Sequence, residues 1–126
     1  GEMTYVNAGH NPPLLRKGDA SGPDSLIELT RTGMALGVIE DTSFEQRTVQ
    51  IAPGDAVFLY TDGVTDAMGI DGQEYGTGRL LRLLGEESRA PAGQLLDAIE
   101  RALHRYVGET SQTDDVTIVA LSRESG

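Results

Sequence analysis

Apolar and polar residues alternate along the first half of the chain, and a period of two predicts β-strands. The candidate strands are residues 3–8, 14–17, 26–30 and 43–52. The turn "GHNPP" separates the first two, so we expect them to form a hairpin. Two later segments, 56–60 ("AVFLY") and 116–121 ("VTIVAL"), are almost continuously apolar. We therefore expect both to lie centrally in a sheet, with both faces covered.

A spacing of three to four residues replaces the alternation between these two apolar segments. It predicts a first helix over residues 77–84, with Thr77 as its N-cap and Gly85 as its stop. A second helix is predicted over residues 91–107, ended by Gly108. The order of strands, two helices and a last strand favours an α+β fold with antiparallel sheets over alternating βαβ units.

The length of 126 residues suits one domain or a large piece of one. A content of 38% apolar and 24% charged residues is typical of a globular chain. No apolar run approaches the roughly 20 residues that cross a bilayer. The first residues, "GEMTYVNAG", already have a strand pattern. We therefore expect the chain to begin inside a fold, as part of a larger domain.

The net charge and the absence of cysteine limit the possible binding partners and the possible kinds of metal site. With 10 basic and 20 acidic residues, the net charge is -10, which should repel nucleic acid and anionic membrane surfaces. We expect neither as a partner. The absence of cysteine excludes disulfides and thiolate metal sites and is compatible with a cytoplasmic location. Most of the carboxylates should serve solubility, while a few are candidates for binding cations.

Acidic residues stand at the ends of both apolar segments. Asp62 follows segment 56–60, and Asp114 and Asp115 precede segment 116–121. If these strands are antiparallel neighbours, the end of one lies beside the start of the other. Carboxylates at one rim repel each other unless a cation separates them, and Mg²⁺ and Mn²⁺ prefer oxygen ligands. Gly63 would let the loop turn sharply and leave room for an ion.

A simpler explanation exists for the same residues. Asp-Gly is among the commonest turn dipeptides, and "TDG" at 61–63 is by itself better explained as a turn. With the acidic pair before the last strand, a cation site and a turn explain the residues equally well. The spacing of the residues alone does not decide between them. His10, at the tip of a turn, is a candidate ligand or proton donor, although such a histidine more often packs at the surface.

The motifs, taken in order, are similar to a known family. They are "YVNAGHNPPLL", "GMALGV", "IAPGDAVFLYTDGVTDA", "GQEYGTGRL" and "TDDVTIVAL". This ordered set resembles the metal-dependent protein phosphatases (the PPM or 2C-like family), and within it the bacterial branch of the sporulation stage II E phosphatase. The resemblance covers nearly the whole chain. It implies an α-β-β-α sandwich that hydrolyses phosphoserine or phosphothreonine with two Mn²⁺ or Mg²⁺ ions, which activate the attacking water.

The resemblance also assigns roles to individual residues. Asp62 matches the aspartate of the family's "TDG" motif, and Asp114 matches the aspartate before the last strand; both are metal ligands by this resemblance. Asp66 matches a second acid of the same loop, a candidate for an additional ion. Asp115 takes the place of Asp114 if the register is off by one. His10 stands where other branches carry an aspartate that helps to hold a third ion, and imidazole is a poorer ligand for Mg²⁺.

One departure limits the expected activity. The family carries an Asp-Val-x-Gly-His-Gly segment whose aspartate bridges both ions, and nothing in this chain matches it. We therefore expect residues 1–126 to be the C-terminal part of a single phosphatase domain, without its N-terminal strands, and to be weak or inactive alone. The resemblance implies a phosphorylated regulatory protein, of the anti-sigma factor antagonist type, as substrate. The alternative is a non-catalytic, partner-binding pseudophosphatase, and open sheet edges would also permit a homodimer.

Overall fold

The computed structural model describes residues 1–30, 32–33, 43–87, 90–108 and 115–124. The strands are β1 (Glu2–Tyr5), β2 (Leu14–Arg16), β3 (Leu26–Glu28), β4 (Arg47–Gln50), β5 (Ala56–Tyr60) and β6 (Ile118–Ser122). The helices are the 3-10 helix η1 (Gly22–Ser25) and the α-helices α1 (Asp62–Thr65), α2 (Gly76–Glu86) and α3 (Ala92–Val107). No helix among the described residues is long and apolar enough to span a bilayer.

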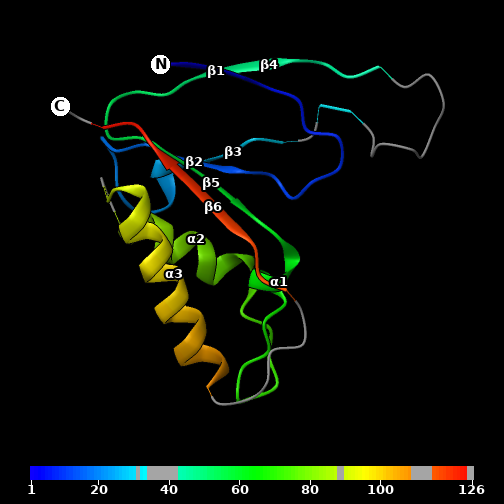
Figure 1. Cartoon of the computed structure of the whole chain (residues 1–126), viewed down its shortest axis with the longest axis vertical. Helices are drawn as coiled ribbons and strands as arrows, with labels where there is room; N and C mark the ends of the chain where they lie inside the picture. The colour runs from blue at the N-terminus through cyan, green and yellow to red at the C-terminus, as the bar shows by residue number, and fades with distance from the viewer. Residues whose placement is uncertain (31, 34–42, 88–89, 109–114, 125–126) are drawn as a thin grey trace.

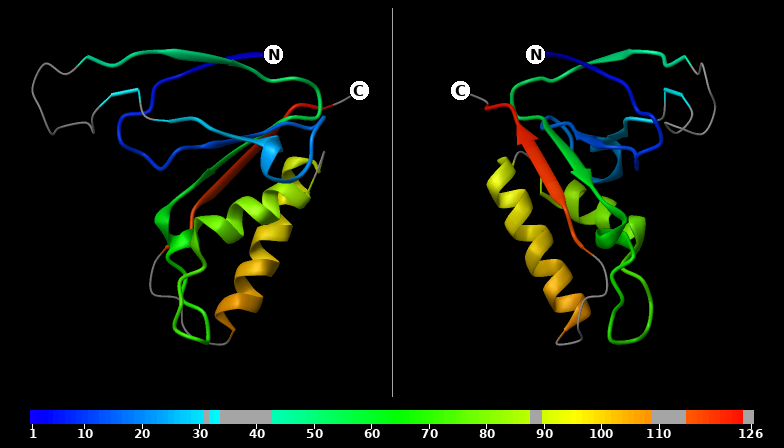
Figure 2. Two further views of the ribbon diagram at one scale, coloured as in Figure 1. Left: turned by 180° about the vertical axis from the view of Figure 1, so that it is seen from behind. Right: turned by 45° about the vertical axis from the view of Figure 1, so that its right-hand side comes forward.

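The described elements form three layers (Figure 1). Strands β3, β2, β5 and β6 make a four-stranded antiparallel sheet in that order, and β1 pairs with β4 in a second sheet. Helices α2 and α3 cover one face of the larger sheet, and the smaller sheet lies over the other (Figure 2). Within β5, Phe58 packs toward the helices and Val57 toward the smaller sheet. The prediction that segment 56–60 is central and buried is confirmed.

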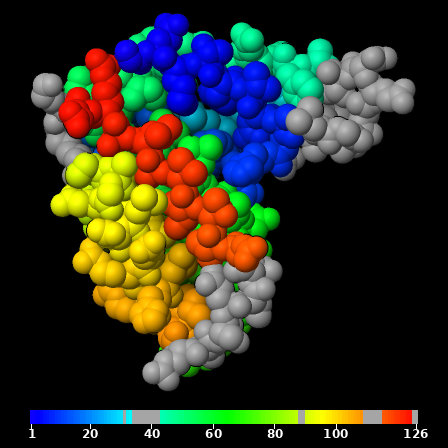
Figure 3. All heavy atoms as spheres, in the orientation of Figure 1, coloured from blue at the N-terminus to red at the C-terminus, as the bar shows by residue number. Residues whose placement is uncertain are grey.

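The same prediction is wrong for the last strand. Strand β6 is the final strand of its sheet among the described residues. Ile118 and Ala120 pack toward the helices, whereas Val119 and Leu121 are 46% and 59% exposed. Figure 3 shows β6 running across an open face of the molecule. An apolar run indicates that a strand can be covered on both faces, but it does not reveal whether the chain supplies the cover.

The expected hairpin of the first two strands does not form either. Strand β1 pairs with β4, and β2 pairs with β3 and β5. The segment 6–13 therefore carries the chain from one sheet to the other instead of reversing it within one. Alternation and a turn motif fix neither the partner nor the sheet of a strand, because strands distant in sequence compete for the same edge.

Both predicted helices are present, with different ends. Helix α2 starts at Gly76, so Thr77 lies inside it and does not cap it. It also continues through Gly85, which is buried against the backbone of Gly22, where a Cβ would lie 2.8 Å from the carbonyl oxygen. Tertiary packing thus explains this glycine. Helix α3 does end at Gly108, whose φ of 69° suits glycine.

Candidate metal centre

The end of β5 and the start of β6 meet, as the antiparallel arrangement predicts. Tyr60 pairs with Ile118 in the register of the two strands. Beyond this pair, the Thr61 N–H donates to the Thr117 carbonyl at 3.1 Å, and the Thr117 N–H donates to the Thr61 hydroxyl at 3.1 Å. The two segments therefore stay joined up to the residues that flank the acidic motifs.

Gly63 has a role that the sequence did not reveal. It lies in the single-turn helix α1, and a Cβ there would overlap the carbonyl oxygen of Asp115 and approach the Val116 Cα to 3.3 Å. The expectation that Gly63 leaves room for an ion is therefore wrong, because the backbone before β6 fills that space. Glycine is needed here so that the two strand ends can approach each other closely.

Asp62 opens helix α1 and is exposed. Its backbone carbonyl accepts a hydrogen bond from the Asp66 N–H at 2.7 Å. Its side-chain Oδ1 accepts one from Nδ2 of Asn11 at 2.6 Å. Asn11 belongs to the segment between β1 and β2, 51 positions earlier. The sequence alone does not point to Asn11, because "GHNPP" indicates only a turn and carries no signal of this distant contact.

The strand that delivers Asp62 is firmly packed. Tyr60 is buried, and its ring stacks on that of Phe58 with 6.0 Å between centroids. Burial raises the pKa of Tyr60, and the negative charges of Glu28 and Asp62 raise it further. Tyr60 therefore stays a neutral phenol beside the exposed carboxylate. The position of the Asp62 backbone is set by this buried pair and by the pairing with β6.

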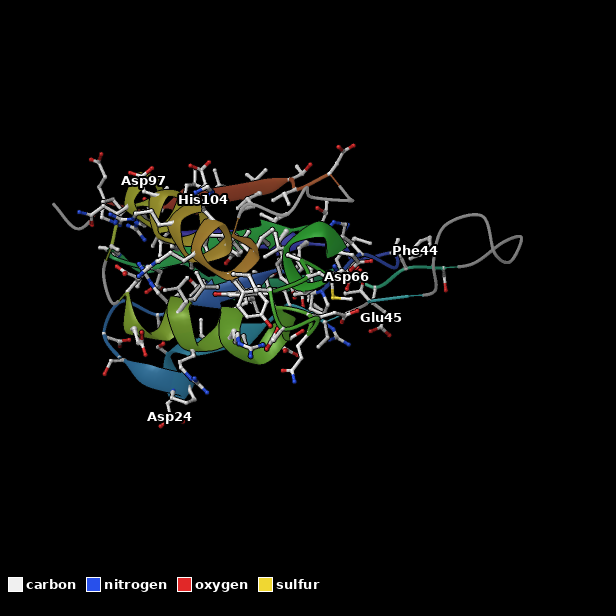
Figure 4. The ribbon with its side chains drawn as sticks, turned by 90° about the horizontal axis from the view of Figure 1, so that it is seen from below. Asp24, Phe44, Glu45, Asp66, Asp97 and His104 are labelled. Atoms are coloured by element: carbon white, nitrogen blue, oxygen red, sulfur yellow. The ribbon has the colours of Figure 1, made fainter. Side chains whose placement is uncertain are left out.

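The remaining acidic candidates are less well defined. Asp66 is exposed at the end of α1, well away from Asp97 on α3 (Figure 4). Asp115 is exposed just before β6, and Asp114 lies outside the described residues. Within the described ranges, no three Asp, Glu, His or Cys residues gather closely enough to hold a metal ion. The donor chemistry fits Mg²⁺ or Mn²⁺, since the ligands offered at this rim are carboxylate oxygens.

His10 is exposed and its ring is tied to its own turn. Nδ1 lies 2.8 Å from the carbonyl oxygen of Asn11, and the His10 N–H donates to the Asn7 side chain at 2.9 Å. These contacts fix the turn that carries Asn11. The role of His10 as a ligand or proton donor stays a prediction.

Comparison with known proteins identifies the family. The family model described as stage II sporulation protein E (SpoIIE) matches residues 1–124. The chain belongs to the SpoIIE family. The resemblance that the motifs predicted is thereby confirmed.

Individual relatives agree with this SpoIIE assignment. Protein IcfG of Synechocystis sp. is 32% identical over 98% of this chain, which spans 19% of IcfG. Phosphoserine phosphatase RsbU of Bacillus subtilis is 25% identical over 98% of this chain, which spans 35% of RsbU. The chain superimposes on the SiaA-PP2C domain of Pseudomonas aeruginosa with a TM-score of 0.79 and 26% identity, over 98% of this chain and 46% of that one.

Two conclusions follow from these SpoIIE-family relatives. The mixed fold with antiparallel sheets is that of a PP2C phosphatase domain, as the sequence predicted. The chain spans less than half the length of each of these three relatives. The named activity, phosphoserine phosphatase, is that of RsbU, a much longer protein.

Proposed function

We propose that residues 1–126 form the C-terminal part of a single metal-dependent phosphatase domain of the SpoIIE family. The domain hydrolyses phosphoserine or phosphothreonine on a regulatory protein. The observation that carries this proposal is Asp62, an exposed carboxylate fixed by Asn11 where β5 and β6 meet. The name of RsbU supports the reaction, and the superposition on a PP2C domain supports the fold.

The residues of this chain would form one side of the centre. Asp62 and Asp114 would hold the metal, with Asp66 and Asp115 as further candidate ligands. Two Mn²⁺ or Mg²⁺ ions, when bound, would supply an activated water and neutralise the phosphoryl oxygens. Because Asp62 and Asp66 are exposed, a phosphorylated side chain of another protein can reach them.

The proposed substrate is a small phosphorylated regulatory protein of the anti-sigma factor antagonist type, in the bacterial cytoplasm. The printed activity of RsbU, phosphoserine phosphatase, supports a phosphoserine-bearing substrate, whereas the class of partner follows from the motif resemblance. The net charge of -10 argues against nucleic acid and anionic membranes as binding partners.

Calorimetric titration with Mn²⁺ tests the metal-binding part of the proposal. We expect the chain to bind Mn²⁺ and Asp62→Ala to lose that binding. The Asp19→Asn variant, which changes an exposed acid in another turn, is the control and should bind as the wild type does. Equal binding by wild type and Asp62→Ala would contradict the role of Asp62.

Hydrolysis of p-nitrophenyl phosphate tests whether residues 1–126 carry only part of the catalytic metal centre. We expect little or no turnover by this chain with Mn²⁺, because the bridging aspartate of the Asp-Val-x-Gly-His-Gly segment is absent from its sequence. Robust turnover that disappears in Asp62→Ala would show that residues 1–126 suffice for catalysis.

A second candidate is a partner-binding fragment or pseudophosphatase. It is favoured by the outer face of β6, where Val119 and Leu121 are exposed beside an edge that pairs with no other described strand. Such an edge invites pairing with another strand, including one from a second copy. No Mn²⁺ binding up to millimolar concentration, together with a dimer in light scattering, would favour this candidate. A strict monomer would count against the homodimer.

A further inference from the structure

We propose that Asn11 is a positioning residue that fixes the Asp62 carboxylate for a divalent cation. This inference rests on the proposed function, in which Asp62 is a metal ligand. Nδ2 of Asn11 donates to Oδ1 of Asp62 at 2.6 Å, so the amide contacts one oxygen of the carboxylate directly. One carboxylate oxygen is thereby held in place, and no residue that the structure describes donates to the other, which we assign to the cation.

The chemistry of the donor matters as much as its distance. A carboxylate only accepts hydrogen bonds, so the amide nitrogen of Asn11, and not its oxygen, must face Asp62. The amide orients the carboxylate but does not neutralise it. A lysine or arginine in this place would cancel the charge that attracts a divalent cation. Asn11 thus combines orientation with retention of the negative charge.

The segment that carries Asn11 is itself anchored. Asn7 is 4% exposed, and its Oδ1 accepts from the N–H groups of Gly9 and His10 at 3.2 and 2.9 Å. Its Nδ2 donates to the Leu29 carbonyl at 3.2 Å. Its backbone also exchanges two hydrogen bonds of 2.9 Å with Thr32, one of them to the Thr32 hydroxyl. The turn is therefore fixed from the core side before it reaches Asn11.

The residues after Asn11 restrict it further. Pro12 and Pro13 follow directly, and a residue before proline is confined to extended backbone conformations. A ligand must be held within a fraction of an ångström, and outer partners of a metal ligand usually supply this precision. The buried Asn7, the turn and Asn11 form a continuous support for one exposed carboxylate.

A purely structural role makes a different prediction. If the Asn11–Asp62 contact only ties the turn to the end of β5, removing it lowers stability and leaves cation affinity unchanged. The chain contains a matched control for this distinction. Gln50 Nε2 donates to Glu2 Oε2 at 3.4 Å, an exposed amide–carboxylate contact between β4 and β1.

The first measurement is Mn²⁺ affinity, read from the relaxation of water protons. Asn11→Ala should raise the Kd about tenfold, the effect expected of an outer partner of a metal ligand. Asn11→Leu, which keeps the branched shape without the donor, should behave alike, and Gln50→Ala should match the wild type. Circular dichroism without metal confirms that each variant is folded. If Asn11→Ala does not fold, Asn11→Leu and the second measurement decide.

The second measurement follows the Asn11 side-chain amide by NMR during a titration with Mg²⁺. Its signals should shift in the wild type and stay fixed in Asp62→Ala. Unchanged Kd values in both Asn11 variants, with binding lost in Asp62→Ala, would overturn the role of Asn11 and leave the proposed function intact. Identical Mn²⁺ affinity in wild type and Asp62→Ala, or no binding by either, would overturn the proposed function and the inference together.

Discussion

Two aspartates stand at opposite ends of strand β5 and differ in almost every physical respect. Asp55, before the strand, is 1% exposed and accepts hydrogen bonds from Lys17 and, at 2.8 Å each, from the N–H groups of Gly18 and Ala52. Asp62, after the strand, is exposed, and among the described residues its side chain accepts a hydrogen bond from Asn11 alone. Both residues occur in ordinary turn motifs in the sequence, "PGD" and "TDG".

The difference shows that the same side chain can serve stability in one place and function in another, depending on what surrounds it. Burial raises the pKa of Asp55, but the hydrogen bonds from Lys17, Gly18 and Ala52 outweigh it, so that the pKa is lowered overall. Its lone pairs are used within the fold, and its charge is balanced by Lys17. Asp62 is exposed, and among the described residues its second carboxylate oxygen accepts no hydrogen bond. The comparison predicts that Asp55 contributes stability and Asp62 contributes binding.

The largest effect is expected from Asp55→Asn. It removes the buried partner of Lys17 and places an amide where three donors converge, so the free energy of unfolding should fall by about 3 kcal/mol. Denaturant unfolding followed by circular dichroism measures this. The control Asp19→Asn, in an exposed turn, should change stability little. A small loss of unfolding free energy in Asp55→Asn would contradict the prediction that Asp55 contributes stability.

The next effect is expected from Gly63→Ala, which acts on the junction beside Asp62. A methyl group there would push the Asp115 backbone away from α1, at a cost of about 2 kcal/mol. Gly78→Ala is the matched control, because Gly78 lies in α2 with open space around its Cα and should gain up to about 1 kcal/mol. Equal effects of the two substitutions in chemical denaturation would show that β5 and β6 do not meet as described.

A smaller effect is expected from acid. Because the pKa of Asp55 is lower in the folded protein, its contribution is complete above the unfolded value of about 3.9 and is lost as the pH falls through the folded pKa. The stability gap between wild type and Asp55→Asn should therefore narrow below about pH 4. Denaturant midpoints between neutral and acidic pH measure the gap, and a constant gap would contradict the lowered pKa.

The smallest effect on stability is expected from Asp62→Ala. Asp62 is exposed, and the substitution removes its hydrogen bond with Asn11. The turn that carries Asn11 is already held by the buried Asn7. We expect its denaturant midpoint to stay near that of the wild type while Mn²⁺ binding is lost. A large loss of stability would mean that Asp62, like Asp55, serves the fold.

The sequence predicted the elements well and their ends less well. The apolar run of β5 and the exit of α3 at Gly108 are present as expected, because burial and glycine geometry act locally. Thr77 and Gly85, the predicted ends of α2, both lie inside it. At Gly85 the packing against the backbone of Gly22 explains the glycine. The assumed hairpin of the first two strands was wrong for a related reason, since β1 finds its partner in β4 across the second sheet.

The acidic rim was predicted in part. The condition on which the rim depends, that the two apolar strands are antiparallel neighbours, is met by the pairing of Tyr60 with Ile118. Asp114 lies outside the described residues, so its role as a ligand stays a prediction. Asn11 could not be found, because no periodicity or motif spacing joins it to Asp62.

The sequence by itself determined what each segment can do: which runs can be buried, where the backbone can turn, and which side chains could ligate a hard cation. These properties depend on a residue and its near neighbours. Only the tertiary structure decided that Asp55 is saturated and Asp62 is left open, because that depends on donors that other segments bring to each end of β5. Lys17 contacts the aspartate at one end of β5, and Asn11 contacts the aspartate at the other end. If the strands paired differently, the same two aspartates would have different contacts.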